Sequence, residues 1–295
     1  MKKYINKFFV LLFVFIIMQS CSTDDQTIDE VIEGVTNGAV LRTISATNTF
    51  NFFDPNDTRF VFDVALEEQD AQDGDLISEI RLYQSFTADT LDDGTDFSRE
   101  EVLILTETPD NLTVSDFGLP RLDFSATLAD AIANNGLSTG EYNGGDVFGF
   151  RFELELTTGA VFTDTNSGGT VTGGSFFSSP FLYNVEIQCI PIVPFAGEYI
   201  LDLEDSEEDG WDGAFITVTI DGVSTNFTAD GAGTVHVISV PMGTTDLMFT
   251  YTAGDSDDDN TYTIEFDPLD GTDPLEAAAD GPDPMTGEIL LNICL

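Results

Sequence analysis

The chain has 295 residues, of which 54 are aspartate or glutamate and only nine are lysine or arginine, giving a formal net charge of −45. A surface with this charge repels nucleic acid and anionic lipid headgroups, so nucleic acid is excluded as an expected partner. Hydrophobic residues still make up 42% of the sequence, too many for a disordered acidic chain. The length is sufficient for two ordinary domains.

The N-terminus has the parts of a secretory signal peptide. Residues 2–7 contain all of the lysines, residues 8–18 are apolar, and Ser20 immediately precedes Cys21. The apolar run is shorter than the roughly 20 residues that a membrane-spanning helix needs, which disfavours that alternative. We therefore expect residues 1–20 to be a lipoprotein signal peptide, with Cys21 as the lipidated residue.

The residues after the cysteine indicate where the anchored protein resides. Ser-Thr-Asp-Asp at 22–25 resembles the short acidic tether that sends Bacteroidota-type lipoproteins to the outer face of the outer membrane. The whole stretch 21–38 is polar and acidic, as expected for a flexible stalk. The resemblance implies a lipid-anchored outer-membrane protein exposed at the cell surface.

Residues 39–189 are predicted to form an Ig-like β-sandwich. Polar and apolar side chains alternate with the period of a half-buried strand in residues 59–66, 78–83 and 147–156, and residues 180–188 supply a last strand. Asp- and Gly-rich turns separate the runs. Residues 125–135 have helical spacing, and we expect one short helix across an end of the sheets.

A second sandwich is predicted after a short linker. Residues 190–194, Ile-Pro-Ile-Val-Pro, neither continue a strand nor begin a helix. Residues 195–295 then contain evenly spaced short strands, which favours a jelly-roll-like sandwich. The expected strands are 197–203, 214–220, 223–229, 234–240, 246–252, 261–266 and 288–294. The predicted fold class is therefore all-β, with two tandem β-sandwich domains after the signal peptide and stalk.

Two cysteines bracket the C-terminal segment. Cys189 precedes it and Cys294 lies at its far end. In an oxidising exterior they are expected to pair, and the alternative is two unrelated buried thiols.

An acidic loop in the second sandwich is the densest group of potential ligands. Seven of the eleven residues from Asp202 to Asp212 are acidic. Calcium prefers six to eight oxygen ligands, and acids on a tight loop can supply several of them. The loop begins like an EF-hand at Asp205, but Ile216 stands where the bidentate glutamate is required. An EF-hand is thus excluded, and the alternatives are another type of calcium site or a solvated acidic turn.

A family resemblance supports the calcium alternative. Gly197-Glu198-Tyr199, Asp205-Ser206 and the run from Asp209 to Ala214 resemble the "DSxGDGWxGA" module of extracellular bacterial β-sandwich domains. The resemblance implies that the acids hold a structural cation at a turn between strands. Glu207 and Glu208 depart from the aromatic residue and glycine that the module usually has there.

A second acidic run, residues 255–260, lies in a predicted hairpin loop of the same domain. It either completes the first site, forms a site of its own, or is a solvated tip. The residues that we expect to bind calcium are Asp205, Glu207, Asp209, Asp212, Asp255 and Asp257.

Trp211 is the only tryptophan, and it lies within the acidic loop. As an exposed residue it would bind ligand, stacking on a sugar ring beside a calcium ion. The favoured alternative is an indole folded inward as a hydrophobic plug, because this tryptophan recurs in proteins of unlike function that carry the module.

The composition argues against an enzyme. The mature chain has no lysine for a Schiff base or a phosphate-binding loop, and the only histidine, His236, alternates with Thr234 and Ile238 on a predicted strand. With 54 acids, pairs of carboxylates at any spacing occur by chance, so they do not identify a glycoside hydrolase. A hydrolase is the third-ranked alternative.

The expected function is non-catalytic binding. The first hypothesis is capture of a glycan or nutrient beside an outer-membrane uptake complex, since the layout resembles starch-utilisation-type surface glycan-binding lipoproteins. That likeness concerns architecture alone. The alternative is a structural or adhesive cell-envelope protein whose domains contact other proteins. Calcium is the expected cofactor in either case.

Overall fold

The computed structural model describes residues 38–89, 94–174 and 176–295. The predicted signal peptide, the lipidated Cys21 and the predicted stalk up to residue 37 lie outside the described residues. Within the described ranges, no helix is long and apolar enough to cross a membrane.

Nearly all regular structure is β. The strands before residue 190 are β1 (Val40–Asn51), β2 (Phe62–Gln69), β3 (Ile77–Thr87), β4 (Arg99–Glu107), β5 (Thr113–Val114), β6 (Pro120–Ala126), β7 (Val147–Leu156), β8 (Val161–Phe162) and β9 (Leu182–Gln188). The short helical elements are η1 (Pro109–Asn111), α3 (Leu128–Asn134) and α4 (Gly169–Thr172). The later strands are β10 (Gly197–Asp205), β11 (Phe215–Ile220), β12 (Val223–Phe227), β13 (Gly233–Val240), β14 (Leu247–Thr252), β15 (Asn260–Asp267), β16 (Leu275–Asp280) and β17 (Gly287–Ile289).

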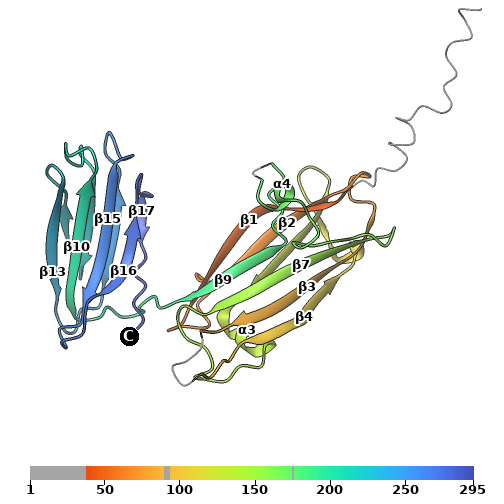
Figure 1. Ribbon diagram of the computed structural model, residues 1–295, viewed down its shortest axis with the longest axis horizontal. Coiled ribbons are helices and arrows are strands. Elements are labelled where there is room, and N and C mark those ends of the chain that lie inside the picture. Colours follow the sequence, from red (N-terminus) through yellow and green to blue (C-terminus); the bar gives the residue numbers. More distant parts are fainter. Residues whose placement is uncertain (1–37, 90–93, 175) are drawn as a thin grey trace, which may run out of the picture. The chain divides into compact units, whose positions relative to one another are not determined.

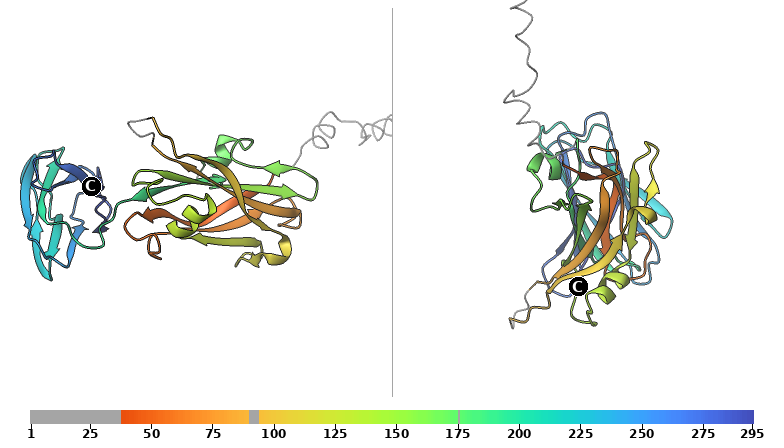
Figure 2. Two further views of the ribbon diagram at one scale, coloured as in Figure 1. Left: turned by 90° about the horizontal axis from the view of Figure 1, so that it is seen from below. Right: turned by 90° about the vertical axis from the view of Figure 1, so that its right-hand side faces the viewer.

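Strands β1–β9 form a sandwich whose two layers share β1. The strand order is β4-β3-β7-β9-β1-β2-β6-β5, with β8 beside β7. Residues 40–48 of β1 pair antiparallel with β2, and residues 49–51 pair parallel with β9, so β1 passes from one layer to the other (Figures 1 and 2). Phe62 of β2 stacks on Phe150 of β7 in the interior, with ring centroids 4.3 Å apart. The predicted all-β sandwich fold is confirmed.

A short helix lies at one end of this sandwich, as the sequence pattern predicts. Thr127 caps α3 by accepting from the backbone N–H of Asp130, whose carboxylate accepts from the N–H of Thr127 in return. The buried side chain of Gln84, on β3, donates to the carbonyl of Ala131 at 2.8 Å. The helix is shorter than predicted, because Ser125 still belongs to β6.

Strands β10–β17 form two four-stranded antiparallel sheets. Their orders are β13-β10-β15-β16 and β12-β11-β14-β17. Apolar side chains from both sheets share one core, in which Tyr199 and Leu201 of β10 and Phe249 of β14 are fully buried. Figure 1 shows β13, β10, β15 and β16 side by side.

Seven strands were expected in this segment, and the structure has eight. The missing strand, β16, has the sequence Leu-Glu-Ala-Ala-Ala-Asp, which lacks the β-branched and aromatic residues that mark a strand. It pairs with β15 and so is an edge strand defined by its neighbour. The last strand, β17, is shorter than the predicted 288–294 and ends at Ile289.

The predicted disulfide between Cys189 and Cys294 is present, with Cα atoms 5.1 Å apart and a sequence separation of 105 residues. Two hydrogen bonds to the backbone of Cys189 support the bridge. Asn292 accepts from the N–H of Cys189 through Oδ1 at 2.6 Å, and Ile293 donates to the carbonyl of Cys189 at 2.8 Å. The C-terminal end of the chain is thereby fixed beside the end of β9.

Candidate cation site

The acidic loop begins where β10 ends, and Asp205 organises it. Its side chain is only 3% exposed. Oδ1 accepts from the backbone N–H of Glu207 at 2.8 Å and of Glu208 at 3.0 Å, and Oδ2 accepts from the N–H of Gly210. Burial disfavours the charged form, but these three donors outweigh it and hold the pKa of Asp205 below its ordinary value. Asp205 is therefore a carboxylate held in a fixed orientation by the backbone of its own loop.

Trp211 is the plug of this loop. The indole is 1% exposed, packs edge-on against Tyr251 and donates from Nε1 to the carbonyl of Glu204 at 2.9 Å. A tryptophan held in this way has no free face for a sugar ring. The expectation that Trp211 binds ligand as an exposed residue is wrong, and the plug alternative is the observed one.

The second acidic loop, between β14 and β15, packs directly on the first. A Cβ atom on Gly254 would lie 2.5 Å from the backbone nitrogen of Ala214, so only glycine allows this approach. Asp257 organises the second loop. Its Oδ1 accepts from the Tyr251 hydroxyl at 2.9 Å and from the N–H of Gly254 at 2.9 Å.

Three carboxylates from the two loops converge. Ligand atoms of Asp205, Asp209 and Asp259 all lie within 4.8 Å of one another. Burial and the nearby charge of Asp205 raise the pKa of Asp259. The three carboxylates thus repel one another, and a divalent cation bound between them would offset that repulsion.

The strand register explains why Asp259 reaches the first loop. Asp205 at the end of β10 pairs with Asn260 at the start of β15, which brings the preceding residue beside the acidic loop. Asn260 is fully buried, and its Nδ2 donates to the Ser256 carbonyl and to Asp257, both at 3.3 Å. Its Oδ1 has no hydrogen-bond partner among the described residues. This buried oxygen belongs to the residue that directly follows Asp259 in the chain.

The structure brings together only two of the six predicted ligands, Asp205 and Asp209. Glu207 is exposed and contributes its backbone N–H to Asp205, while the Asp212 carbonyl accepts from the N–H of Asp255 at 3.1 Å. Asp257 is engaged in shaping its own loop. Among the described residues, none of these four belongs to the converging group. Asp259 is not among the predicted ligands, but it does belong to the converging group.

The histidine lies where the sequence pattern predicts. His236 is on β13, where its Nε2 is 3.1 Å from the carbonyl oxygen of Thr228 and its ring contacts that of Phe227. It therefore has a packing role on the strand.

No protein-family model matches this chain, and no curated protein sequence matches it significantly. The resemblance of the acidic loop to the "DSxGDGWxGA" module therefore remains a prediction from the sequence.

Proposed function

We propose that this chain is a lipid-anchored outer-membrane protein, exposed at the cell surface, that captures a glycan or nutrient beside an uptake complex. The observation that carries the proposal is the Cys189–Cys294 disulfide, because such bridges persist in oxidising compartments outside the cytoplasm. It agrees with the predicted secretory signal peptide and with the predicted lipidation at Cys21. The strong negative charge favours a neutral ligand over an anionic one.

Calcium is the proposed cofactor, with a structural role. Asp205, Asp209 and Asp259 supply the hard oxygen ligands that calcium prefers, and water or backbone carbonyls would complete the coordination. A bound cation would connect the loop after β10 to the loop before β15, because it would take ligands from both. Its effect would be to stabilise the fold and hold both loops in one arrangement.

The anchor is tested in a Gram-negative host that expresses the full-length chain. We expect metabolic labelling with a radioactive fatty acid, recovery in the outer membrane and digestion by protease added to intact cells. Cys21→Ala should abolish the label and release the protein from the membrane. A labelled Cys21→Ala variant, or protection of the wild-type chain in intact cells, would contradict the proposal.

Ligand capture is tested with the chain from residue 22 onward, which contains every described residue. We expect binding to at least one member of a panel of neutral oligosaccharides built from glucose, mannose, galactose or xylose. Failure to bind any of them would contradict glycan capture.

A structural or adhesive role is the second candidate, and one observation favours it. Val235 and Val237 are more than half exposed on β13, an edge strand of its sheet. Exposed valines beside unpaired strand groups suit the addition of a strand from another protein. Charged substitutions at both valines would reduce adhesion if this role is correct and would leave glycan binding unchanged.

A further inference from the structure

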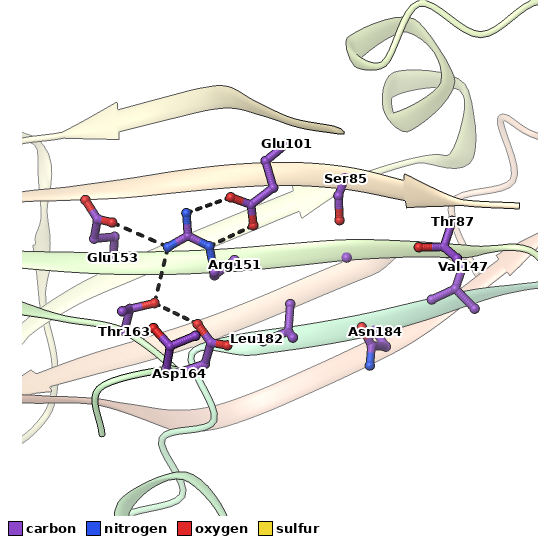
Figure 3. Close-up of a pocket in the computed structure, with 12 residues that line it drawn as sticks. Ser85, Thr87, Glu101, Val147, Arg151, Glu153, Thr163, Asp164, Leu182 and Asn184 are labelled. Carbon is purple, nitrogen blue, oxygen red and sulfur yellow. Dashed lines mark hydrogen bonds and ion pairs between the residues drawn. The ribbon is translucent and has the colours of Figure 1, made fainter. Parts of the chain in front are cut away.

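A polar groove of about 640 Å³ lies on the outer face of the layer formed by β3, β4, β7 and β9 (Figure 3). The period of two along each strand places alternate residues of β3, β7 and β9 on this face. Its volume falls within the range of small-molecule sites. The groove is remote in sequence from the acidic loops, and all of its lining residues lie between positions 85 and 184.

A glycine forms the floor of the groove. Gly149 on β7 pairs with Ser85 on β3 and with Asn184 on β9, so the three residues form one row across the sheet. A Cβ atom at position 149 would lie 2.7 Å from the Ser85 hydroxyl oxygen. The missing side chain leaves a notch, and Figure 3 shows Ser85 and Asn184 on opposite sides of β7.

The polar groups beside the notch are available to a ligand. The hydroxyls of Ser85 and Thr87 and the side-chain amide of Asn184 line the groove. None of the three side chains has a hydrogen bond to another described residue. Hydroxyls and amides can both donate and accept, which matches the hydroxyl groups of a sugar. Leu182, about one-third exposed, lies next to them and offers an apolar surface to the C–H groups of a ring.

One end of the groove is lined by an arginine that is paired with acidic residues. Arg151 donates to Glu101 through Nε at 2.7 Å and through an Nη atom at 2.8 Å, and its guanidinium lies 4.5 Å from the Tyr83 ring centroid. Hydrogen bonds to Glu101 raise the pKa of Arg151, so it remains charged. A second Nη atom of Arg151 also contacts Thr163 at 3.2 Å. These contacts occupy the guanidinium, so it is not a free receptor for an anion.

The charge of the lining decides between ligand classes. Glu101, Glu153 and Asp164 outnumber the single guanidinium of Arg151. Glu101 and Glu153 contact the guanidinium, and Asp164 accepts from the Thr163 hydroxyl at 2.7 Å. Anionic ligands are therefore repelled, and the acids are engaged with neighbouring residues rather than free to bind an amine. The polar groups that remain available to a ligand, the hydroxyls of Ser85 and Thr87 and the amide of Asn184, are neutral.

We propose that this groove is the saccharide-binding site, in which Ser85 and Asn184 hydrogen-bond hydroxyl groups of a neutral sugar across Gly149. Thr87 extends the polar row, and Leu182 packs against a face of the ring. This assignment rests on the proposed function in glycan capture and moves its site from the acidic loop to the first sandwich.

The test uses the chain from residue 22 onward and the neutral oligosaccharide panel. For the sugar bound best, Ser85→Ala with Asn184→Ala should weaken binding at least about tenfold by calorimetry. Gly149→Val, which fills the notch, should abolish binding. The matched control, Ser45→Ala with Asn226→Ala, removes the same residue types from exposed strand positions outside the groove and should bind like wild type.

The outcomes separate the two proposals. A sugar that binds equally well to the wild type and to both groove variants would overturn the groove assignment while leaving glycan capture intact. Absence of binding to the whole panel would overturn both. Binding of spermidine in the groove, with no sugar competing for it, would overturn the neutral-ligand assignment. Melting temperatures close to that of wild type would show that lost binding does not reflect unfolding.

Discussion

Asp205 lies directly opposite Asn260 in the β10–β15 ladder, and both side chains are buried. The aspartate holds the first acidic loop through three backbone N–H groups, and the asparagine holds the second through the Ser256 carbonyl and Asp257. Asp205 and Asn260 thus connect the end of the β10–β15 ladder to both acidic loops. The carboxylate of Asp259 owes its position beside Asp205 to this register.

Replacing Asn260 should weaken the fold and the candidate cation site together. Asn260→Ala removes the donor to Ser256 and Asp257 and leaves a small void, which should lower the free energy of unfolding by about 1–3 kcal/mol. Urea unfolding measures the loss. Ser256→Ala, an exposed substitution in the same loop, is the control and should have little effect. Equal stability of the two variants would show that the Asn260 contacts contribute nothing.

Trp211 should matter for stability and not for ligand binding. Trp211→Phe removes the N–H donated to the Glu204 carbonyl and reduces contact with Tyr251, so unfolding should become easier by about 1–3 kcal/mol. Sugar binding, measured at a temperature where the variant is folded, should be unchanged. A selective loss of sugar binding at full stability would return the ligand site to the acidic loop.

A buried carboxyl group should make the stability depend on pH. Glu68 is 1% exposed, and neither of its carboxylate oxygens has a hydrogen-bond partner among the described residues. Burial, with a contribution from the charge of Asp70, raises the pKa of Glu68 from an ordinary value of 4.5 to about 8. Between these two values the folded chain retains a proton that the unfolded chain releases. The stability contributed by this group therefore falls as the pH rises from 4.5 to about 8.

Glu68→Gln tests this dependence. The variant should be more stable than wild type at pH 8, at about 1.4 kcal/mol for each unit of pKa shift removed, and its stability should vary less with pH. Urea unfolding at several pH values measures both effects. Glu186→Gln, at an exposed position on β9, is the control. If the free energy of unfolding changed with pH equally in the wild type and in Glu68→Gln, the raised pKa of Glu68 would be contradicted.

Loss of the disulfide should destabilise the chain. The bridge closes a loop of about a hundred residues, for which chain entropy predicts a contribution of about 4–5 kcal/mol. Cys189→Ser with Cys294→Ser should unfold at a lower urea concentration than the oxidised wild type. Reduction of the wild type should produce a similar shift, and identical unfolding of oxidised and reduced wild type would rule out a stabilising role.

The sequence pattern predicts the fold well where one face of a strand is buried. Residues 150–156 alternate strictly, and β7 has the predicted bounds, 147–156. The pattern is weak for β16, because its alanines carry no strand signal and its place depends on pairing with β15. Edge strands of this kind are determined by their neighbours rather than by their own residues.

The candidate site could be predicted only in part, because it depends on pairing between distant strands. The density of acids identifies both loops, but only the β10–β15 register selects Asp259 from its run. The burial of Trp211 likewise depends on a core shared with Tyr251. The groove in the first sandwich has no sequence signal, since Ser85, Gly149 and Asn184 are ordinary residues until three strands align them.

The most direct test of the proposed calcium site is the melting temperature of the chain from residue 22 onward in calcium, in magnesium and in chelator. We expect calcium to raise it in a concentration-dependent way. Asp209→Asn with Asp259→Asn should remove that rise. The matched control, Glu207→Gln with Asp255→Asn, neutralises two acids in the same loops outside the cluster and should retain it. Equal melting temperatures of the wild type in calcium and chelator, or a calcium effect lost equally in both double variants, would contradict a site at Asp205, Asp209 and Asp259.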